Sequence, residues 1–312
     1  MPTIREARGA ADLRPATTPD YGIVEGPRVL HRLSPTVDER RYRLFRLRPL
    51  GRVIGAEIDG VDLGVPVTPD LREELNRALL EWKVLFFRDQ RITSAQQRAF
   101  AANWGGLETN PFLPPGEHDQ VVRFTRTAGM PGYENIWHTD VTWRPEPALG
   151  SVLRLVEVPP AGGDTMWADM AAAYDNLPAG IRERIDGRTA MHDFVPGFDR
   201  FADPALLARW QDAYPPVEHP VVRTHPETGR RTLFVNQAFT THIVGMDKAE
   251  SDELLRYLFL QAHTPEFQVR FRWERDSVAF WDNRATQHYA VNDYHPHVRI
   301  AERVAIVGDR PY

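Results

Sequence analysis

The sequence predicts a mainly β protein, a β-sandwich or jelly roll with helical additions. Many short runs of strand-forming residues crowd the C-terminal half, few stretches place apolar residues at helical spacing, and strands and helices do not alternate as βαβ units. The 312 residues are 42% hydrophobic and 26% charged, which is typical of a globular chain with a sizeable core.

The N-terminal region differs in composition from the rest. Residues 1–41 are rich in Pro, Gly and Arg and lack periodicity, so we expect an extended or disordered arm. Residues 42–312 are expected to form a single domain. Its first part is predicted to contain two short strands within 46–63, a helix over 69–83 with Thr68 or Asp70 as its cap, a buried strand over 84–87 and a helix over 94–105.

A long segment rich in Pro and Gly follows, with one predicted strand over 120–126. Long loops within compact domains are often functional, so residues 106–136 are our candidate lid. Gly229 is expected to close the turn of a hairpin. Beyond the lid we predict helices over 168–186 and 248–263, and strands over 150–157, 187–193, 219–224, 231–236, 266–273, 277–282 and 297–307.

The composition excludes several classes of site. No cysteine is present, which rules out disulfides, thiolate nucleophiles, iron–sulfur clusters and cysteine-ligated zinc. The net charge of −5 argues against a nucleic-acid partner. No apolar run approaches the ~18–20 residues of a spanning helix, and the charged N-terminus is unlike a signal peptide. We therefore expect a cytoplasmic protein with no membrane partner, in which His, Asp or Glu binds any metal.

Two His-x-acid steps are candidate ligand pairs, because a strand places residues i and i+2 on the same face. Chance alone predicts about 1.5 such steps, so context must separate them. His225 and Glu227 lie at a predicted hairpin turn and are interpreted as structural. His138 and Asp140 lie where a long loop meets a strand, which is a typical place for a site.

A facial triad requires a second histidine from another strand. His288 is the best candidate, since it follows the predicted strand over 277–282. Taken alone, a histidine in this position is more often packed or exposed than a metal ligand.

The predicted last strand carries two arginines on one face. Arg299, Ala301, Arg303 and Ala305 alternate with the apolar positions, and the two guanidinium groups start about 13 Å apart along a strand. Guanidinium groups bind carboxylates and sulfonates through two hydrogen bonds, so they are candidate anion clamps on either side of a metal. The alternative is an edge strand with solvated arginines.

Together these segments resemble the taurine dioxygenase family of Fe(II)- and 2-oxoglutarate-dependent oxygenases. The resemblance runs from about residue 42 to the C-terminus and implies a distorted double-stranded β-helix, a cupin-like jelly roll. It is carried, in order, by GAEIDGVDL (55–63), VLFFRDQ (84–90), WHTDVTW (137–143), GGDT (162–165), HDF (192–194), LFVNQAFTTHIVGM (233–246), WDNRATQHYAVNDY (281–294) and RIAERVAIVGD (299–309).

The resemblance also implies roles for individual residues. His138, Asp140 and His288 match the family's iron ligands, and the cosubstrates are 2-oxoglutarate and O2. The remaining matches are Thr165 and Arg299 for the distal carboxylate of 2-oxoglutarate, Arg303 for the anionic head of the substrate, and Phe198 and Phe239 for the substrate pocket.

One position departs from the family pattern. Taurine-using members carry a histidine where this sequence has Asn110, and Asn cannot supply positive charge, so taurine is not the expected substrate. The implied reaction hydroxylates a C–H of a small anionic substrate and releases succinate and CO2. An alkylsulfonate or alkyl sulfate would then collapse to an aldehyde plus sulfite or sulfate.

Several alternatives remain open at this point. The same chemistry could act on an aryloxy acid, on a carboxylate or amino-acid-like compound, or on a natural product. A zinc hydrolase with the same three ligands, or a non-catalytic jelly-roll binding protein, would also fit the ligand pattern. The resemblance further suggests a homodimer or homotetramer.

Overall fold

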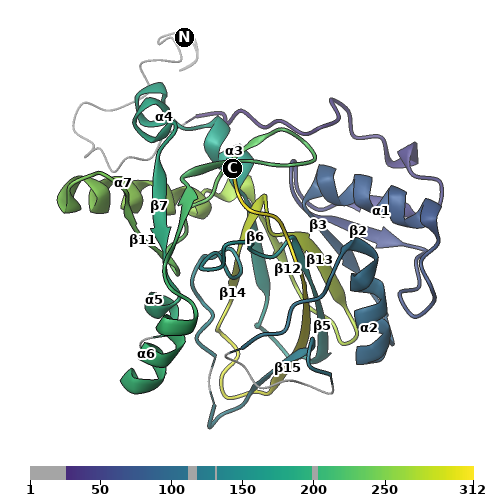
Figure 1. The fold of residues 1–312 in the computed structure, drawn as a ribbon. Helices are drawn as coiled ribbons and strands as arrows, with labels where there is room; N and C mark the ends of the chain where they lie inside the picture. The colour runs from purple at the N-terminus through teal and green to yellow at the C-terminus, as the bar shows by residue number, and fades with distance from the viewer. Residues whose placement is uncertain (1–25, 112–117, 131, 199–202) are drawn as a thin grey trace, which may run out of the picture.

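A computed structural model describes residues 26–111, 118–130, 132–198 and 203–312 (Figure 1). Most of the predicted arm and part of the predicted lid therefore lie outside the described residues. Among the helices of these ranges, none is long and apolar enough to cross a membrane.

The strands are short, as the brief apolar runs of the sequence predict. Nearly all pair antiparallel; β2 and β3 pair in parallel. Their bounds are Arg46–Pro49 (β1), Ala56–Asp59 (β2), Val84–Phe87 (β3), Val122–Arg126 (β4), Gly150–Glu157 (β5), Thr165–Asp169 (β6), Thr189–His192 (β7), Val217–Pro220 (β8), Val222–Thr224 (β9), Arg231–Leu233 (β10), Thr240–Ile243 (β11), Gln268–Phe271 (β12), Val278–Asp282 (β13), Thr286–Ala290 (β14) and Arg299–Ile306 (β15).

Within the described ranges, a seven-stranded sheet has the order β1-β2-β3-β13-β5-β15-β4, and a three-stranded sheet has the order β12-β6-β14. Aromatic rings connect the two sheets: Phe86 of β3 stacks on Phe271 of β12 at 4.0 Å between centroids, and Trp167 of β6 meets Trp281 of β13 at 5.8 Å. The predicted double-stranded β-helix, or jelly roll, is thereby confirmed. Smaller sheets, β11-β7-β8 and β10-β9, extend it.

Helices cover the outer face of the large sheet and build a lobe on the other side (Figure 1). Strand β13 is buried throughout, because Phe280 packs toward α1 and α2 while Trp281 packs into the interior between the sheets. The helices are Pro69–Trp82 (α1), Ser94–Ala101 (α2), Met170–Asp175 (α3), Ala179–Ile185 (α4), Val195–Phe198 (α5), Pro204–Ala213 (α6) and Lys248–Leu260 (α7), with short 3₁₀ turns at Glu39–Arg41, Ala102–Trp104, Gln261–His263 and Pro265–Phe267.

Local capping explains where the early helices begin. The side chain of Thr68 accepts a hydrogen bond from the Leu71 amide at the start of α1. Thr93 and Gln96 form a reciprocal capping box at the start of α2. Both helix starts lie where the sequence predicts them.

The predicted helix over 168–186 is wrong in its first part. Ala168 and Asp169 instead end β6, the central strand of the small sheet, which the sequence did not predict, and the helical part is divided into α3 and α4. Asp169 ends the strand and starts α3, because its carboxylate accepts hydrogen bonds from the amides of Ala171 and Ala172. Pro178 separates α4 from α3. Strands β11 and β14 and helices α5 and α6 were not predicted.

A buried ion pair connects the end of α1 to the junction between β6 and α3. Lys83, at the left-handed end of α1, places its Nζ 3.1 Å from Asp169 Oδ2, and both side chains are almost completely buried. The ammonium also donates to the carbonyl oxygens of Val53 and Glu81. Removal of either partner would leave the other as an uncompensated buried charge.

We therefore expect Asp169→Ala to lower the free energy of unfolding by about 3–5 kcal/mol, measured by urea denaturation. The control is Asp252→Ala, which removes the partner of the other lysine, Lys248, at an exposed site on α7. It should change stability by about 0.5 kcal/mol or less. Equal effects in the two variants would contradict a special role for the buried pair.

Candidate functional site

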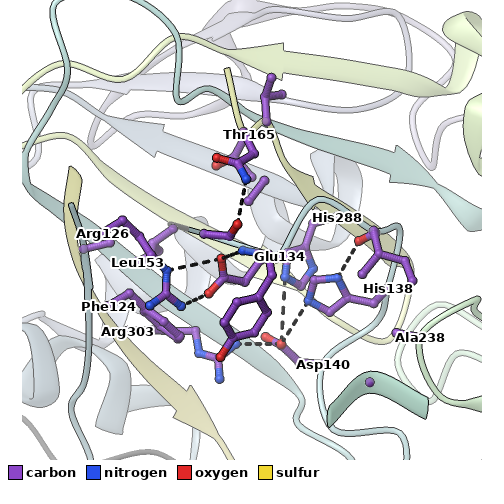
Figure 2. Close-up of a pocket in the computed structure, with 18 of the residues that line it drawn as sticks. Phe124, Arg126, Glu134, His138, Asp140, Leu153, Thr165, Ala238, His288 and Arg303 are labelled. Carbon is purple, nitrogen blue, oxygen red and sulfur yellow. Dashed lines mark hydrogen bonds and ion pairs between the residues drawn. The ribbon is translucent and has the colours of Figure 1, made fainter. Parts of the chain in front are cut away.

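His138, Asp140 and His288 come together at one end of a cavity inside the jelly roll (Figure 2). Two backbone hydrogen bonds, of 3.0 and 2.8 Å, join His138 to His288 and place their rings 4.1 Å apart. Asp140 Oδ1 lies 3.7 Å from His138 Nε2 and 3.8 Å from His288 Nε2. The three potential ligand atoms lie within 4.8 Å of one another, so they could hold one metal ion.

The backbone from His138 to Asp140 is not the regular strand that the His-x-Asp spacing predicts. His138 forms an isolated bridge, and the chain then turns at Asp140. Val141 follows in the left-handed region, with a φ of 50°. The two side chains therefore meet because of a tight turn, and not through regular strand alternation.

The protonation states of the cluster suit a metal ion. The Nδ1 of His138 lies 2.8 Å from the Ile136 carbonyl, and the opposite ring nitrogen, Nε2, faces Asp140. Burial, together with the neighbouring His138, lowers the pKa of His288 to about 3. Burial alone would raise the pKa of Asp140, but Arg303 and the two histidines outweigh it and lower that pKa to about 2. The neutral imidazole of His288, the imidazole of His138 and an ionised carboxylate thus face one point, a donor set that fits Fe(II).

Arg303 of β15 contacts the same carboxylate. Its Nη1 donates to Asp140 Oδ1 at 2.6 Å, and its guanidinium lies 5.4 Å from the ring centroid of Phe124. In the described part of the chain, its buried Nε has no hydrogen-bond partner. Arg303 therefore offers an available donor beside the cluster.

Arg299, four residues earlier on the same face of β15, lines the same cavity. Its Nη2 lies 3.5 Å from Thr165 Oγ1 and its Nε donates to the Gly163 carbonyl at 3.1 Å. Trp273 donates to the same Thr165 hydroxyl at 2.9 Å. Among the residues that the structure describes, no carboxylate forms an ion pair with Arg299, so this buried guanidinium presents an uncompensated positive charge.

A third arginine, which the sequence reasoning missed, also lines the cavity. Arg126 of β4 lies opposite Arg299 in the β4–β15 ladder and forms an ion pair with Glu134 (Figure 2). Burial alone would raise the pKa of Glu134, but Arg126 outweighs it and lowers that pKa. Nothing in the sequence marks Arg126 and Glu134 as partners, because Glu134 lies in an irregular segment.

The remaining wall is largely apolar. Phe239 approaches His138 with 6.3 Å between ring centroids, and Phe198, Leu153 and Val141 line the same cavity. Asn110 also lines it and is half-buried. The structure thus places every sequence-predicted site residue around one cavity.

His225 and Glu227 do not contribute to the cavity. His225 Nε2 lies 2.9 Å from Asp282 Oδ2, and Arg284 ion-pairs with both Asp282 and Glu227. This network packs beneath the turn between β13 and β14. Its members hold structure together, as the sequence context indicated.

His192 supports the segment that carries Asp140. Its Nδ1 lies 2.9 Å from the Thr142 hydroxyl, and the amide of Asn236 donates to the same hydroxyl at 3.1 Å. His192 is fully buried, and burial, with a smaller contribution from His219, lowers its pKa well below the usual value. His192 is therefore neutral near pH 7.

Comparisons with known proteins agree with this geometry. The family model for taurine catabolism dioxygenases, TauD, TfdA family, matches residues 46–305. An alpha-ketoglutarate-dependent sulfate ester dioxygenase of Pseudomonas putida is 38% identical, covering 85% of this chain and 90% of its own. An alkylsulfatase of Acinetobacter baylyi is 35% identical, with coverages of 85% and 86%. The crystal structure of a taurine dioxygenase from Burkholderia xenovorans aligns with a TM-score of 0.75 at 39% identity, covering 86% and 93% of the two chains.

The buried neutral His192 makes stability depend on pH. Its folded pKa is below the unfolded value, so the unfolded state binds more protons, and its contribution is lost as the pH falls below about 6.5. Between pH 6.5 and 5 we expect the unfolding free energy to fall more steeply than in His192→Gln, by up to about 1.4 kcal/mol per pH unit. Urea denaturation at several pH values measures both slopes, and equal slopes would contradict the assignment.

Proposed function

The chain belongs to the taurine dioxygenase (TauD/TfdA) family, and we propose that it hydroxylates the carbon bearing the sulfate group of a small alkyl sulfate ester. As a member of this family, it is a non-haem Fe(II)- and 2-oxoglutarate-dependent dioxygenase that uses O2. Family membership therefore sets aside the zinc hydrolase and the non-catalytic binding protein. The observation that carries the substrate proposal is Arg303, a cation beside the metal-binding cluster at one end of an otherwise largely apolar wall.

We assign the three-residue cluster to the metal. His138, Asp140 and His288 would hold iron through two imidazole nitrogens and one carboxylate oxygen, which is the donor set of non-haem iron sites. This assignment is supported by the neutral state of His288 and the ionised state of Asp140 at pH 7. The Nδ1 contact of His138 with a backbone carbonyl fixes its ring orientation.

We assign the far end of the cavity to 2-oxoglutarate. Arg299 would hold the distal carboxylate, with the Thr165 hydroxyl as a second donor or orienting group. Trp273 and the Gly163 carbonyl keep these two side chains in place. When bound, iron and 2-oxoglutarate together supply the oxidation, in which O2 is consumed, succinate and CO2 are released, and a hydroxyl group is added to a substrate C–H.

The charge balance of the cavity favours a singly charged anionic substrate. Arg126 is neutralised by Glu134, and Arg303 by Asp140. A divalent iron and Arg299 then face the two carboxylates of 2-oxoglutarate, which leaves one surplus positive charge. An alkyl sulfate carries one negative charge, and the unpartnered Nε of Arg303 is a donor for it.

The apolar wall distinguishes an alkyl chain from taurine. Taurine carries an ammonium group, and its burial against Phe198, Phe239 and Leu153 would be costly without a partner. Asn110 adds no charge for a second contact with a sulfonate. The printed names of two relatives, a sulfate ester dioxygenase and an alkylsulfatase, support the same substrate class.

The residues of the chain determine which C–H bond reacts. Arg303, 2.6 Å from Asp140, would hold the sulfate next to the metal cluster, so that the carbon attached to the sulfate oxygen is nearest. Hydroxylation of this carbon gives an unstable hydroxy sulfate. Its hydroxyl proton is lost, its carbon–oxygen bond to sulfate breaks, and an aldehyde and sulfate leave.

We propose that residues 42–312 act as one catalytic domain and that the segment 106–136 serves as its lid. The position of Glu134 in this segment, paired with Arg126 at the cavity, supports the lid assignment. We further propose a cytoplasmic homodimer or homotetramer.

The two arginines of β15 should differ in the kinetic constant that they control. Arg299→Ala should raise the KM for 2-oxoglutarate, and Arg303→Ala the KM for the sulfate ester, each by about 30-fold or more, since loss of one member of a charged contact costs about 2–5 kcal/mol. Steady-state succinate formation measures both constants. If Arg303→Ala changes only the KM for 2-oxoglutarate, its assignment to the substrate is wrong.

Hexyl sulfate, hexanesulfonate, taurine and phenoxyacetate form a matched panel for the substrate. We expect hexyl sulfate to give the highest kcat/KM, with one sulfate and one aldehyde released per succinate, because its charge fits Arg303 and its chain fits the apolar wall. Sulfate is measured by ion chromatography. Preferred turnover of taurine or of phenoxyacetate would contradict the alkyl sulfate proposal while leaving the dioxygenase class intact.

A further inference from the structure

We propose that Asn283 is a positioning residue, which holds the backbone of Asp140 in a strained turn and so directs its carboxylate at His138 and His288. The inference rests on the proposed role of Asp140 as a metal ligand. It adds a residue that contacts neither the metal nor the substrate.

The amide of Asn283 holds both backbone groups of Asp140. Its Oδ1 accepts a hydrogen bond from the Asp140 amide at 2.9 Å, and its Nδ2 donates to the Asp140 carbonyl at 3.1 Å. The same Nδ2 also donates to the Ala148 carbonyl at 3.1 Å, and the backbone amide of Asn283 donates to Leu149. At 1% exposure, the Asn283 side chain replaces the strand partner that this irregular segment lacks.

The residue after Asp140 explains why such a partner is needed. Val141 has a φ of 50°, a conformation that is unfavourable for a β-branched side chain. A backbone hydrogen bond from the Arg144 amide to the Val141 carbonyl closes the turn. Strain of this kind persists only where the surroundings over-determine it, and the Asn283 contacts lie directly before the strained residue.

Asn283 is itself rigidly mounted. The preceding Asp282 is completely buried, and its carboxylate accepts from Arg284 and from His225. The Thr286 hydroxyl donates to the Asp282 carbonyl. The His225 network, which has no place in the cavity, thus anchors the turn that presents Asn283.

The same turn leads into His288. The Thr286 carbonyl, two residues before His288, accepts a hydrogen bond from the Thr139 hydroxyl at 2.9 Å. Hydrogen bonds from Asn283 and Thr286 thereby fix the segment that carries Asp140 to the same turn that leads into His288. Asn283 binds only the backbone of Asp140, whereas the carboxylate has its own partners, Arg303 at Oδ1 and the Ser151 hydroxyl at Oδ2.

Mn(II) affinity tests the proposal without turnover, with free Mn(II) measured by electron paramagnetic resonance. We expect Asn283→Ala to weaken Mn(II) binding by about 10–100-fold, which is typical of lost outer-shell support. The matched control is Gln97→Ala, which removes a fully buried amide that donates to two backbone carbonyls on the far face of the sheet. This control should lower the melting temperature and leave Mn(II) affinity within about two-fold, since outer-shell effects require contact with a ligand.

The rescue variant separates positioning from general destabilisation. In Asn283→Ala/Val141→Gly, glycine adopts the left-handed conformation without strain, so Mn(II) affinity should recover in part. Unchanged affinity in Asn283→Ala, or no recovery in the double variant, would overturn the proposal. If Asn283→Ala does not fold, Asn283→Ser replaces it, because serine cannot bridge both backbone groups of Asp140, and unchanged affinity there overturns the proposal equally.

The design distinguishes two kinds of failure. If the unmodified protein binds no Mn(II), and no visible band forms on anaerobic addition of Fe(II) and 2-oxoglutarate, the metal assignment of the proposed function is wrong. If the unmodified protein binds Mn(II) and Asn283→Ala binds it equally well, only the positioning role of Asn283 is wrong.

Discussion

The site depends on one short interaction, the pair of backbone hydrogen bonds between His138 and His288. These residues are far apart in the sequence, and one of them lies in an irregular segment with little strand pairing of its own. The bridge adds this segment to the edge of β14, places two imidazoles side by side, and brings Asp140 to face them. Strands β6, β13 and β14 contribute to the site through this bridge, because they hold His288 in place.

Burial of charge is the second organising constraint. Arg126, Arg299 and Arg303 line one cavity, and such charges need partners away from water. Glu134 and Asp140 compensate two of them within the described part of the chain, whereas Arg299 has only the Thr165 hydroxyl and a carbonyl oxygen. A cavity of this composition is poorly suited to neutral molecules and well suited to anions. The positive charge of the cavity therefore favours anionic ligands, and the shape of the cavity then discriminates among them.

Local patterns in the sequence predicted the fold class and singled out His138, Asp140, His288, Arg299 and Arg303. The roles of Thr165, Phe198, Phe239 and Asn110 were implied only by the family resemblance. The alternation along β15 separates Arg299 and Arg303 from the apolar face, and the spacing of His138 and Asp140 is visible by inspection. Sequence reasoning missed β6, whose last residue, Asp169, is also the cap of α3, so that the strand and the helix meet without an intervening turn. The left-handed Val141 and the Arg126–Glu134 pair could not be predicted, since tertiary contacts impose both. Asn283 lies within WDNRATQHYAVNDY (281–294), but only the folded structure shows that its amide holds the backbone of Asp140.

Strand β15 sets the distance between the two proposed anion clamps. Arg299 and Arg303 lie on one face of a strand that is paired on both sides, by β4 and β5, so neither can slide without breaking two ladders. Moving a clamp by one residue would turn it to the opposite face, and the next allowed position lies about 6.6 Å away. The distance between the two proposed anion-binding positions can therefore change only in steps of two residues. Under the proposed roles of Arg299 and Arg303, a change in substrate size has to be accommodated by the loops and side chains around the cavity, because the strand itself fixes the distance between the two guanidinium groups.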